Sequence, residues 1–211
     1  AVLTILMTFF ANVKARGAFT GDATIVSTYY WRGVKQFDGA ALQGTAELTI
    51  GPVTAGYWIS SMTGGIAGET DPYIRLSLPL GPIKSSIGGT IYSYDFFKQK
   101  ENTVYEFFAS LRYGALNAGI YLTPEQQNGD IPSVYWMEIG VGGHCFGADA
   151  GAIFGYGDYS AFISPQHEAV GTLLLSVTKA ASESVTISWN WIMALNRGMD
   201  NGFFFSLGYE F

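Results

Sequence analysis

The sequence predicts an all-β fold, a transmembrane up-and-down antiparallel barrel of about twelve strands. Three observations support this prediction. Charged residues make up only 13% of the chain, whereas aromatic residues reach 16% and glycines number 27. Segments of roughly ten residues alternate in polarity, and the connections between them alternate between short and long. Short turns on one side and longer loops on the other are typical of bacterial outer-membrane barrels.

Composition also excludes other classes of protein. Apolar residues make up 48% of the chain, but beyond the N-terminal segment no apolar run approaches the roughly 20 residues that a membrane-spanning helix needs. The charged fraction lies well below the roughly 25% of ordinary soluble domains. A soluble sandwich or lipocalin-type barrel, with the same residues turned inside out, is therefore disfavoured. The net charge of −6 comes without a cluster of basic residues, so nucleic acid is not an expected partner.

Residues 1–21 differ from the rest of the chain. Residues 1–11 form an apolar run, and Val13 and Ala15 suit the −3 and −1 positions of a signal-peptidase site. We expect residues 1–21 to be the remainder of an export signal, with a retained N-terminal segment or lumen plug as the alternative. Residues 22–211 would then form one barrel domain.

The segments with alternating polarity define the expected strands. They cover residues 22–34, 41–50, 53–62, 72–80, 83–94, 103–113, 115–122, 133–143, 147–156, 168–178, 184–194 and 202–211. Short turns are expected at residues 51–52, 81–82, 114–115, 144–146 and 179–183. Longer connections are expected at residues 35–40, 63–71, 95–102, 123–132, 157–167 and 195–201. With an even number of strands, both termini of the barrel domain lie at the same end as the short turns, on the periplasmic side.

The last segment, residues 202–211, is the clearest single strand. Its apolar residues share one face and its polar residues share the other. An alternating apolar strand that ends in an aromatic carboxy-terminal residue resembles the signal by which outer-membrane proteins are recognised for barrel assembly. We expect this signal to consist of Phe205, Leu207, Tyr209 and Phe211, with the barrel-assembly machinery as a partner.

The polar faces of the segments predict the lining of the lumen, because in lipid the apolar faces must point outward. The charged residues expected to line a pore are Arg32, Glu47, Arg75, Lys84, Glu106, Arg112, Glu138, Asp149 and Glu210. Opposite charges among them should pair and leave a weak, slightly acidic net field. Four of them, namely Arg32, Arg75, Glu106 and Glu138, are expected toward the external end and the others toward the periplasm.

Aromatic residues near strand ends predict girdles at the membrane interfaces, where rings with polar tips settle at the headgroup level. The residues expected in the external girdle are Tyr29, Trp31, Tyr73, Tyr105, Tyr135, Trp189 and Trp191.

Residues 29–44 carry a resemblance to a known family. Their pattern of Arg32-Gly33, Gln36, Ala41 and Gln43-Gly44 is similar to the opening of TorF-like porins, also described as the Gcw_chp family. Lys35 and Ala40 depart from the pattern, where Ser and Pro are expected. The resemblance is good over residues 22–62 and extends to about residue 125. The resemblance implies an outer-membrane porin but does not identify its substrate.

These observations predict a porin-type channel in the bacterial outer membrane, for passive diffusion of small hydrophilic solutes. We expect the pore to be narrow and weakly cation-preferring. The alternative is a non-conducting structural or adhesive barrel that acts through its external loops, since about twelve strands lie between filled eight-stranded and open sixteen-stranded barrels. Membrane lipids and small solutes are the expected partners, and a homo-oligomer is left open.

Neither an enzyme nor a cofactor site is expected. The chain has two histidines, His144 and His167, which are expected in a turn and a loop rather than on the outer wall beside a nucleophile. A Gly-x-Ser-x-Gly elbow is also missing from the sequence. Cys145 beside His144 does not supply the ligands of a zinc site, so no metal is expected.

Overall fold

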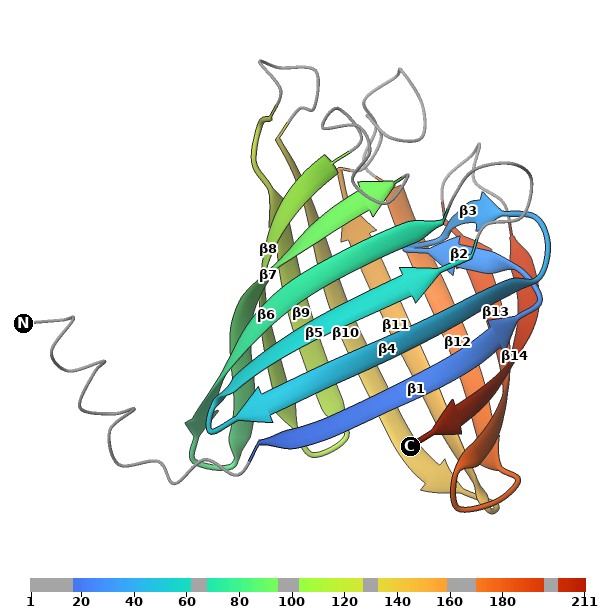
Figure 1. Cartoon of the computed structure of the whole chain (residues 1–211). Helices are drawn as coiled ribbons and strands as arrows, with labels where there is room; N and C mark the ends of the chain where they lie inside the picture. The colour runs from blue at the N-terminus through green and yellow to red at the C-terminus, as the bar shows by residue number, and fades with distance from the viewer. Residues whose placement is uncertain (1–16, 62–67, 95–102, 127–132, 159–169, 196–200) are drawn as a thin grey trace, which may run out of the picture.

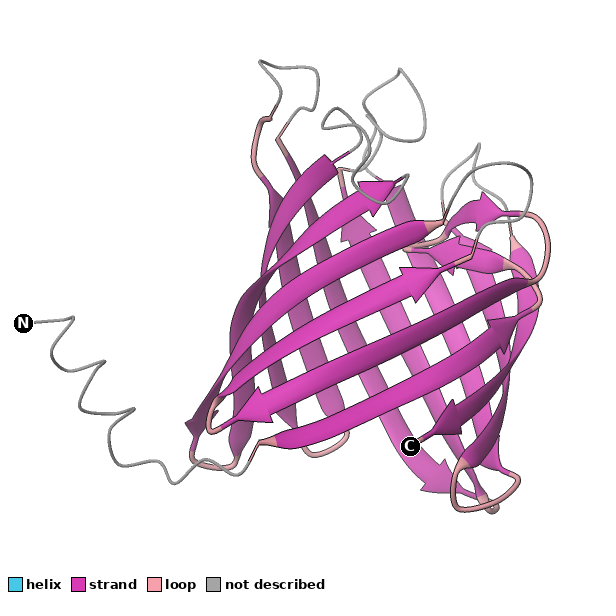
Figure 2. Ribbon diagram, viewed as in Figure 1, coloured by secondary structure: helices cyan, strands magenta, loops and turns pink. Residues whose placement is uncertain are grey.

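A computed structural model describes residues 17–61, 68–94, 103–126, 133–158, 170–195 and 201–211. Within these residues twelve antiparallel strands close into a barrel, and two further strands form a short hairpin (Figures 1 and 2). The predicted fold class and strand number are therefore confirmed.

The described residues form no helix that is long and apolar enough to cross a membrane.

The barrel strands follow one another around the ring in chain order. Their bounds are β1 (Ala18–Val26), β4 (Ala41–Ile50), β5 (Val53–Ser60), β6 (Glu69–Leu80), β7 (Ile83–Tyr94), β8 (Thr103–Tyr113), β9 (Leu116–Thr123), β10 (Val134–Cys145), β11 (Ala148–Gly157), β12 (Val170–Ala180), β13 (Val185–Ala194) and β14 (Gly202–Glu210). The hairpin consists of β2 (Tyr29–Trp31) and β3 (Val34–Phe37) and lies between β1 and β4 in the chain.

The first expected strand, residues 22–34, has the wrong bounds at both ends. β1 begins at Ala18, which pairs with Thr49, so residues 18–21 belong to the barrel rather than to an N-terminal segment. The chain leaves the barrel after Val26 and reverses at Arg32-Gly33, where both residues have positive φ angles of 49° and 82°. This reversal creates the hairpin. Residues 1–16, which carry the expected export signal, lie outside the described residues.

Short turns gather at one end of the barrel. Gly51, Gly81 and Gly114 each take the first turn position with φ near +60°, as in tight hairpins that place glycine first. The turn expected at residues 144–146 lies instead at Phe146-Gly147, because β10 extends to Cys145. β1 begins and β14 ends beside these turns (Figure 1). Most of the residues in the longer connections after residue 62 lie outside the described ranges.

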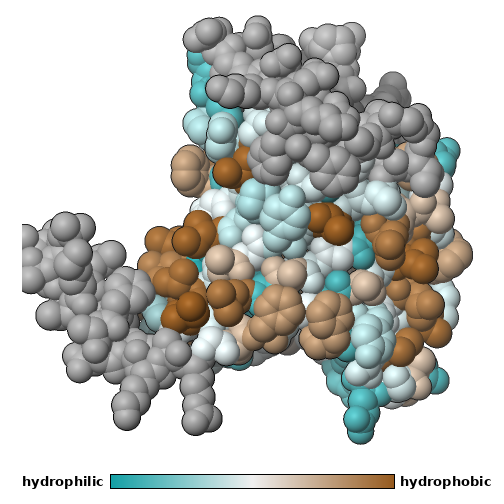
Figure 3. All heavy atoms as spheres, in the orientation of Figure 1, coloured by the Kyte–Doolittle hydropathy of each residue, from teal (hydrophilic) through white to brown (hydrophobic). Residues whose placement is uncertain are grey.

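Apolar side chains cover the outer wall, the reverse of a soluble barrel. Ile74 and Phe107 are exposed by 57% and 59%, and apolar residues of the other strands are also exposed on this wall. Figure 3 shows hydrophobic side chains gathered at the left and the right of the visible face of the barrel. Because side chains alternate along a strand, the polar residues between them face the lumen. The outer wall therefore suits lipid and the inner wall suits water.

The ring closes at the seam between β1 and β14, which is the shortest strand pairing in the barrel. Five residue pairs join the two strands, from Asp22 with Glu210 to Val26 with Ser206. Beyond them, the Phe211 N–H donates to the Gly21 carbonyl at 3.0 Å, and the Gly21 N–H donates to the Phe211 carbonyl at 3.1 Å. The residues of the expected assembly signal lie on the outer wall of this seam, and their role in assembly remains a prediction.

Candidate functional site

The lumen is occupied at the long-loop end by the β2–β3 hairpin. The Tyr29 hydroxyl donates to Glu69 on β6 at 2.9 Å, while the Tyr30 ring stacks on Phe204 of β14 at 5.5 Å. The Trp31 ring meets Tyr92 of β7 edge-on at 5.5 Å. Because these strands lie on separate parts of the ring, the hairpin bridges the bore rather than following one wall.

Arg32, at the tip of the hairpin, forms a buried ion pair with Glu106 on β8. Its two terminal nitrogens lie 2.6 and 2.9 Å from the two carboxylate oxygens, and the two side chains are only 7% and 1% exposed. The Tyr92 hydroxyl donates to the same carboxylate at 2.8 Å. The guanidinium also lies 4.2 Å from the Tyr121 ring centre. A charge-assisted bidentate pair of this kind fixes both position and orientation.

The backbone of Arg32 adopts a conformation that is costly for a residue other than glycine. Its φ of 49° lies in the left-handed region, which costs a residue other than glycine about 1–2 kcal/mol. Such a conformation persists when surrounding contacts determine it. We attribute it to the ion pair with Glu106 and to the stacked aromatic rings.

Two clusters of large side chains fill the space around the hairpin. Trp136 is 1% exposed and packs with Val134 and Val170, against which Trp31 and Tyr121 also pack. Its indole N–H donates to Glu138 at 2.8 Å. The second cluster joins Val26, Tyr29 and Ala41 with neighbouring rings. Buried side chains therefore occupy much of the long-loop half of the lumen.

Two buried carboxylates lie beside the second cluster, and the sequence analysis missed both. Glu69 and Asp71 are 2% and 6% exposed, and their register places them on the inner face of β6. They fell within a connection expected at residues 63–71, whereas β6 begins at Glu69. Burial, followed by the nearby Glu69 carboxylate, raises the pKa of the Tyr29 hydroxyl, which therefore stays protonated as the donor.

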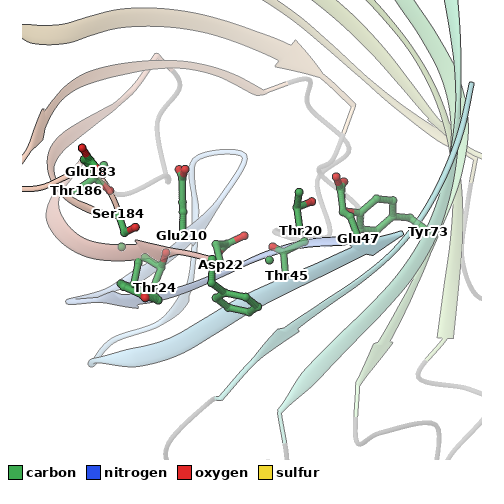
Figure 4. Close-up of a pocket in the computed structure, with 14 residues that line it drawn as sticks. Thr20, Asp22, Thr24, Thr45, Glu47, Tyr73, Glu183, Ser184, Thr186 and Glu210 are labelled. Atoms are coloured by element: carbon green, nitrogen blue, oxygen red, sulfur yellow. The ribbon is translucent and has the colours of Figure 1, made fainter. Parts of the chain in front are cut away.

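The short-turn half of the lumen is open and hydrophilic. A hollow of about 850 Å³ is lined there by β1, β4, β6, β13, β14 and the turn between β12 and β13. Figure 4 shows carboxylates and hydroxyls along this wall. The labelled residues are Thr20, Asp22, Thr24, Thr45, Glu47, Tyr73, Glu183, Ser184, Thr186 and Glu210.

A second ion pair lies in this open half. Arg75 contacts Glu47 at 3.1 Å, and the Tyr73 hydroxyl donates to the same carboxylate at 2.5 Å. The Arg75 and Glu47 side chains are 36% and 22% exposed, much more than Arg32 and Glu106. Arg75 was expected toward the external end, but β6 begins earlier than predicted and places Arg75 opposite Thr54, close to a short turn.

The opposite wall of the open half carries basic groups. A hollow of about 540 Å³ is lined by Arg75, Lys84 and Arg112, together with Ser86 and Ser110. Lys84 on β7 pairs directly with Arg112 on β8 in the strand register. At the rim, His144 Nδ1 lies 2.9 Å from an Asp149 carboxylate oxygen, and both side chains are exposed. His167 lies outside the described residues.

All the charged residues predicted to line a pore lie on the inner side of the structure. Eight lie on the inner faces of barrel strands, and Arg32 reaches the inner face from the hairpin. Their role in conduction remains a prediction. The inner face also carries Asp22, Glu69 and Asp71, so carboxylates outnumber basic groups among the described residues of this face.

The predicted external girdle is wrong at three residues. Tyr29 and Trp31 belong to the hairpin and pack inside the lumen, and Tyr73 faces inward to Glu47. Alternation assigned the first two to a strand that ends earlier than predicted. Four girdle residues do lie on the outer wall by register, namely Tyr105, Tyr135, Trp189 and Trp191. Their placement at a membrane interface remains a prediction.

Comparison with known proteins identifies shared architecture. No family model matches the chain, and no curated sequence matches it, so the similarity to TorF-like porins remains a resemblance of short segments. Among solved structures, the COG4313 outer-membrane channel from Pseudomonas putida F1 matches with a TM-score of 0.57 and 12% identity, over 92% of this chain and 94% of that one. The NanC porin matches with a TM-score of 0.53 and 12% identity, over 92% and 98%. At this identity the likeness shows the barrel fold alone.

Proposed function

We propose that the chain is a porin-type channel of the bacterial outer membrane, through which small hydrophilic solutes diffuse passively. The observation that carries this proposal is the closed barrel with an apolar outer wall and a charged, hydroxyl-rich inner wall that encloses an 850 Å³ hollow. Both NanC and the COG4313 protein, which share the fold, are described as a porin or a channel. The short turns, the start of β1 and the end of β14 would face the periplasm.

The hairpin gives the proposed channel its narrowest part. It bridges the lumen at the long-loop end, where Trp136 and Arg32 are almost fully buried. A pore restricted by bulky side chains admits only small solutes. We therefore propose a low conductance for the protein.

Weak cation preference follows from the charges of the inner face. Carboxylates outnumber basic groups there, but Glu47 and Glu106 are paired with arginines. The remaining acidic charges would raise the local concentration of cations, and salt would screen this effect.

Single-channel recordings of the refolded protein in planar bilayers test this function. We expect small ohmic current steps and, under a salt gradient, a reversal potential that indicates weak cation selectivity at low salt. Marked anion selectivity would overturn the charge assignment. Complete absence of current steps, with the barrel folded, would instead favour the structural or adhesive alternative, in which the buried hairpin closes the lumen.

A further inference from the structure

The open half of the lumen carries acidic charges without counter-charges on one wall. Across the seam, Asp22 of β1 lies directly opposite Glu210 of β14, and Glu183 lies in the adjoining turn. All three line the 850 Å³ hollow, and Figure 4 shows them along one wall. In the described part of the chain none of them has a hydrogen-bonding side-chain partner or a salt bridge.

The other wall carries the opposite arrangement. Lys84 of β7 and Arg112 of β8 occupy directly opposed positions in the strand register and line the second hollow. No carboxylate among the described residues forms a salt bridge with either of them. Like charges that face each other across a strand pair repel. Glu138 of β10 also borders the second hollow, but its carboxylate accepts hydrogen bonds from Trp136 and Tyr121, and among the described residues it forms no salt bridge with Lys84 or Arg112.

The topology sets the two walls across the bore from each other. Between the seam and the β7–β8 pair lie β4, β5 and β6 on one side and β9 to β13 on the other. The Arg75–Glu47 ion pair lies between the walls and contributes no net charge. A positive wall and a negative wall in one water-filled space produce a field across the bore, and this field favours solutes with separated charges.

We propose that this half of the lumen selects zwitterionic hydrophilic solutes of short-peptide length, a proposal that rests on the channel function above. The ammonium end faces Asp22 and Glu210, and the carboxylate end faces Lys84 and Arg112. A ring of twelve strands spaced about 4.8 Å apart and tilted roughly 40° is about 24 Å across between backbones. Long side chains on both walls leave roughly half of this, the length of three to four extended residues.

Flux into proteoliposomes tests the proposal with four solutes that share one backbone. These are triglycine, N-acetyl-triglycine, triglycine amide and N-acetyl-triglycine amide, which are zwitterionic, anionic, cationic and neutral. We expect wild-type protein to pass triglycine about threefold faster than the neutral solute. A ratio of this size is what weak contacts between solvent-exposed charges would produce. It should also pass triglycine faster than either singly charged solute.

Variants of the two walls separate a transverse field from simple charge attraction. Reversing the basic wall with Lys84→Glu and Arg112→Glu should abolish the preference for triglycine. Adding Asp22→Lys and Glu210→Lys to that variant should restore the preference, because the field is then inverted rather than lost. Lys179→Gln, at the exposed end of β12 and on its outer face, is the control that should leave the preference unchanged. If the charge-reversed variants do not fold, the double variant Lys84→Gln/Arg112→Gln provides the same test of the basic wall.

The outcomes distinguish this proposal from the channel function. Equal flux of triglycine and the neutral solute through wild-type protein would overturn zwitterion selection and leave the channel intact. Retention of the preference after loss of the basic wall would also overturn it. Absence of flux for all four solutes would overturn the channel function, and the selection with it.

Discussion

The two halves of the lumen use the same kinds of residue in opposite ways. In the long-loop half, the hairpin brings aromatic rings and Arg32 into the bore, where charges are paired and buried. In the short-turn half, charged side chains border hollows, and several of them form no ion pair with another described residue. In the proposed channel the hairpin would form the constriction, and the open half would form a wider vestibule.

The two arginine–glutamate pairs show the same contrast in energetic terms. Arg32 and Glu106 are almost fully buried, so the loss of either partner leaves an isolated charge away from water. Arg75 and Glu47 are partly exposed, so water can compensate for the loss of one partner. Equivalent substitutions in the two pairs should have unequal effects.

The largest expected effect is on stability in the constricted half. Arg32→Ala should lower the free energy of unfolding by about 3–5 kcal/mol, because Glu106 stays buried without its partner. Arg75→Ala in the vestibule should lower it by less than about 1 kcal/mol. Urea unfolding of the refolded variants measures the free energy of unfolding of each. The double variant Arg32→Met/Glu106→Leu should recover most of the loss, and equal effects of the two alanine variants would contradict the contrast.

The seam beside the vestibule should be the next most sensitive region. Deletion of Phe211, or Phe211→Asp, removes an apolar ring that lies against Gly21 and, in the deletion, two backbone hydrogen bonds that extend a short pairing. We expect less folded protein in the outer membrane. Heat-modifiable migration in gel electrophoresis measures the folded fraction. Tyr113→Asp, which changes an exposed aromatic residue at the same end of the barrel, is the matched control. Normal insertion of both Phe211 variants would argue against an assembly role.

The smallest effect should come from a single hydrogen bond in the vestibule. Tyr73→Phe removes the donor to Glu47 but keeps the ring and the Arg75 contact. The free energy of unfolding should fall by about 1 kcal/mol, the usual value for one hydrogen bond. Conductance should stay within error of the wild type. A large change in conductance would show that the pair of Arg75 and Glu47, rather than the hairpin, limits the pore.

The sequence was informative where a residue's neighbours repeat a simple pattern. Alternation along β8 assigned Glu106 and Arg112 to the inner face, because a strand with one apolar side in lipid has one permitted orientation. Turn residues such as Gly81-Pro82 located the short-turn end.

The constriction could not be predicted in the same way, because it depends on contacts between residues far apart in the chain. Residues 29–34 alternate well enough to extend a strand, but contacts with residues far away in the chain, such as Arg32 with Glu106 at a separation of 74 positions, hold them in the lumen. Tyr29 and Trp31 were therefore assigned to the outer wall. The Arg32-Gly33 pair, with glycine suited to a tight turn, was the one local signal of the reversal.

The conductance of a barrel without its hairpin tests the central claim most directly. In this variant a short Gly-Ser link replaces residues 28–39 and joins β1 to β4 directly. Single-channel recordings in planar bilayers should show current steps several-fold larger than those of the wild type, because the constriction is removed while the vestibule is retained. Equal conductance in the two proteins, or no conductance in the shortened barrel, would contradict the assignment of the hairpin as the constriction of a channel.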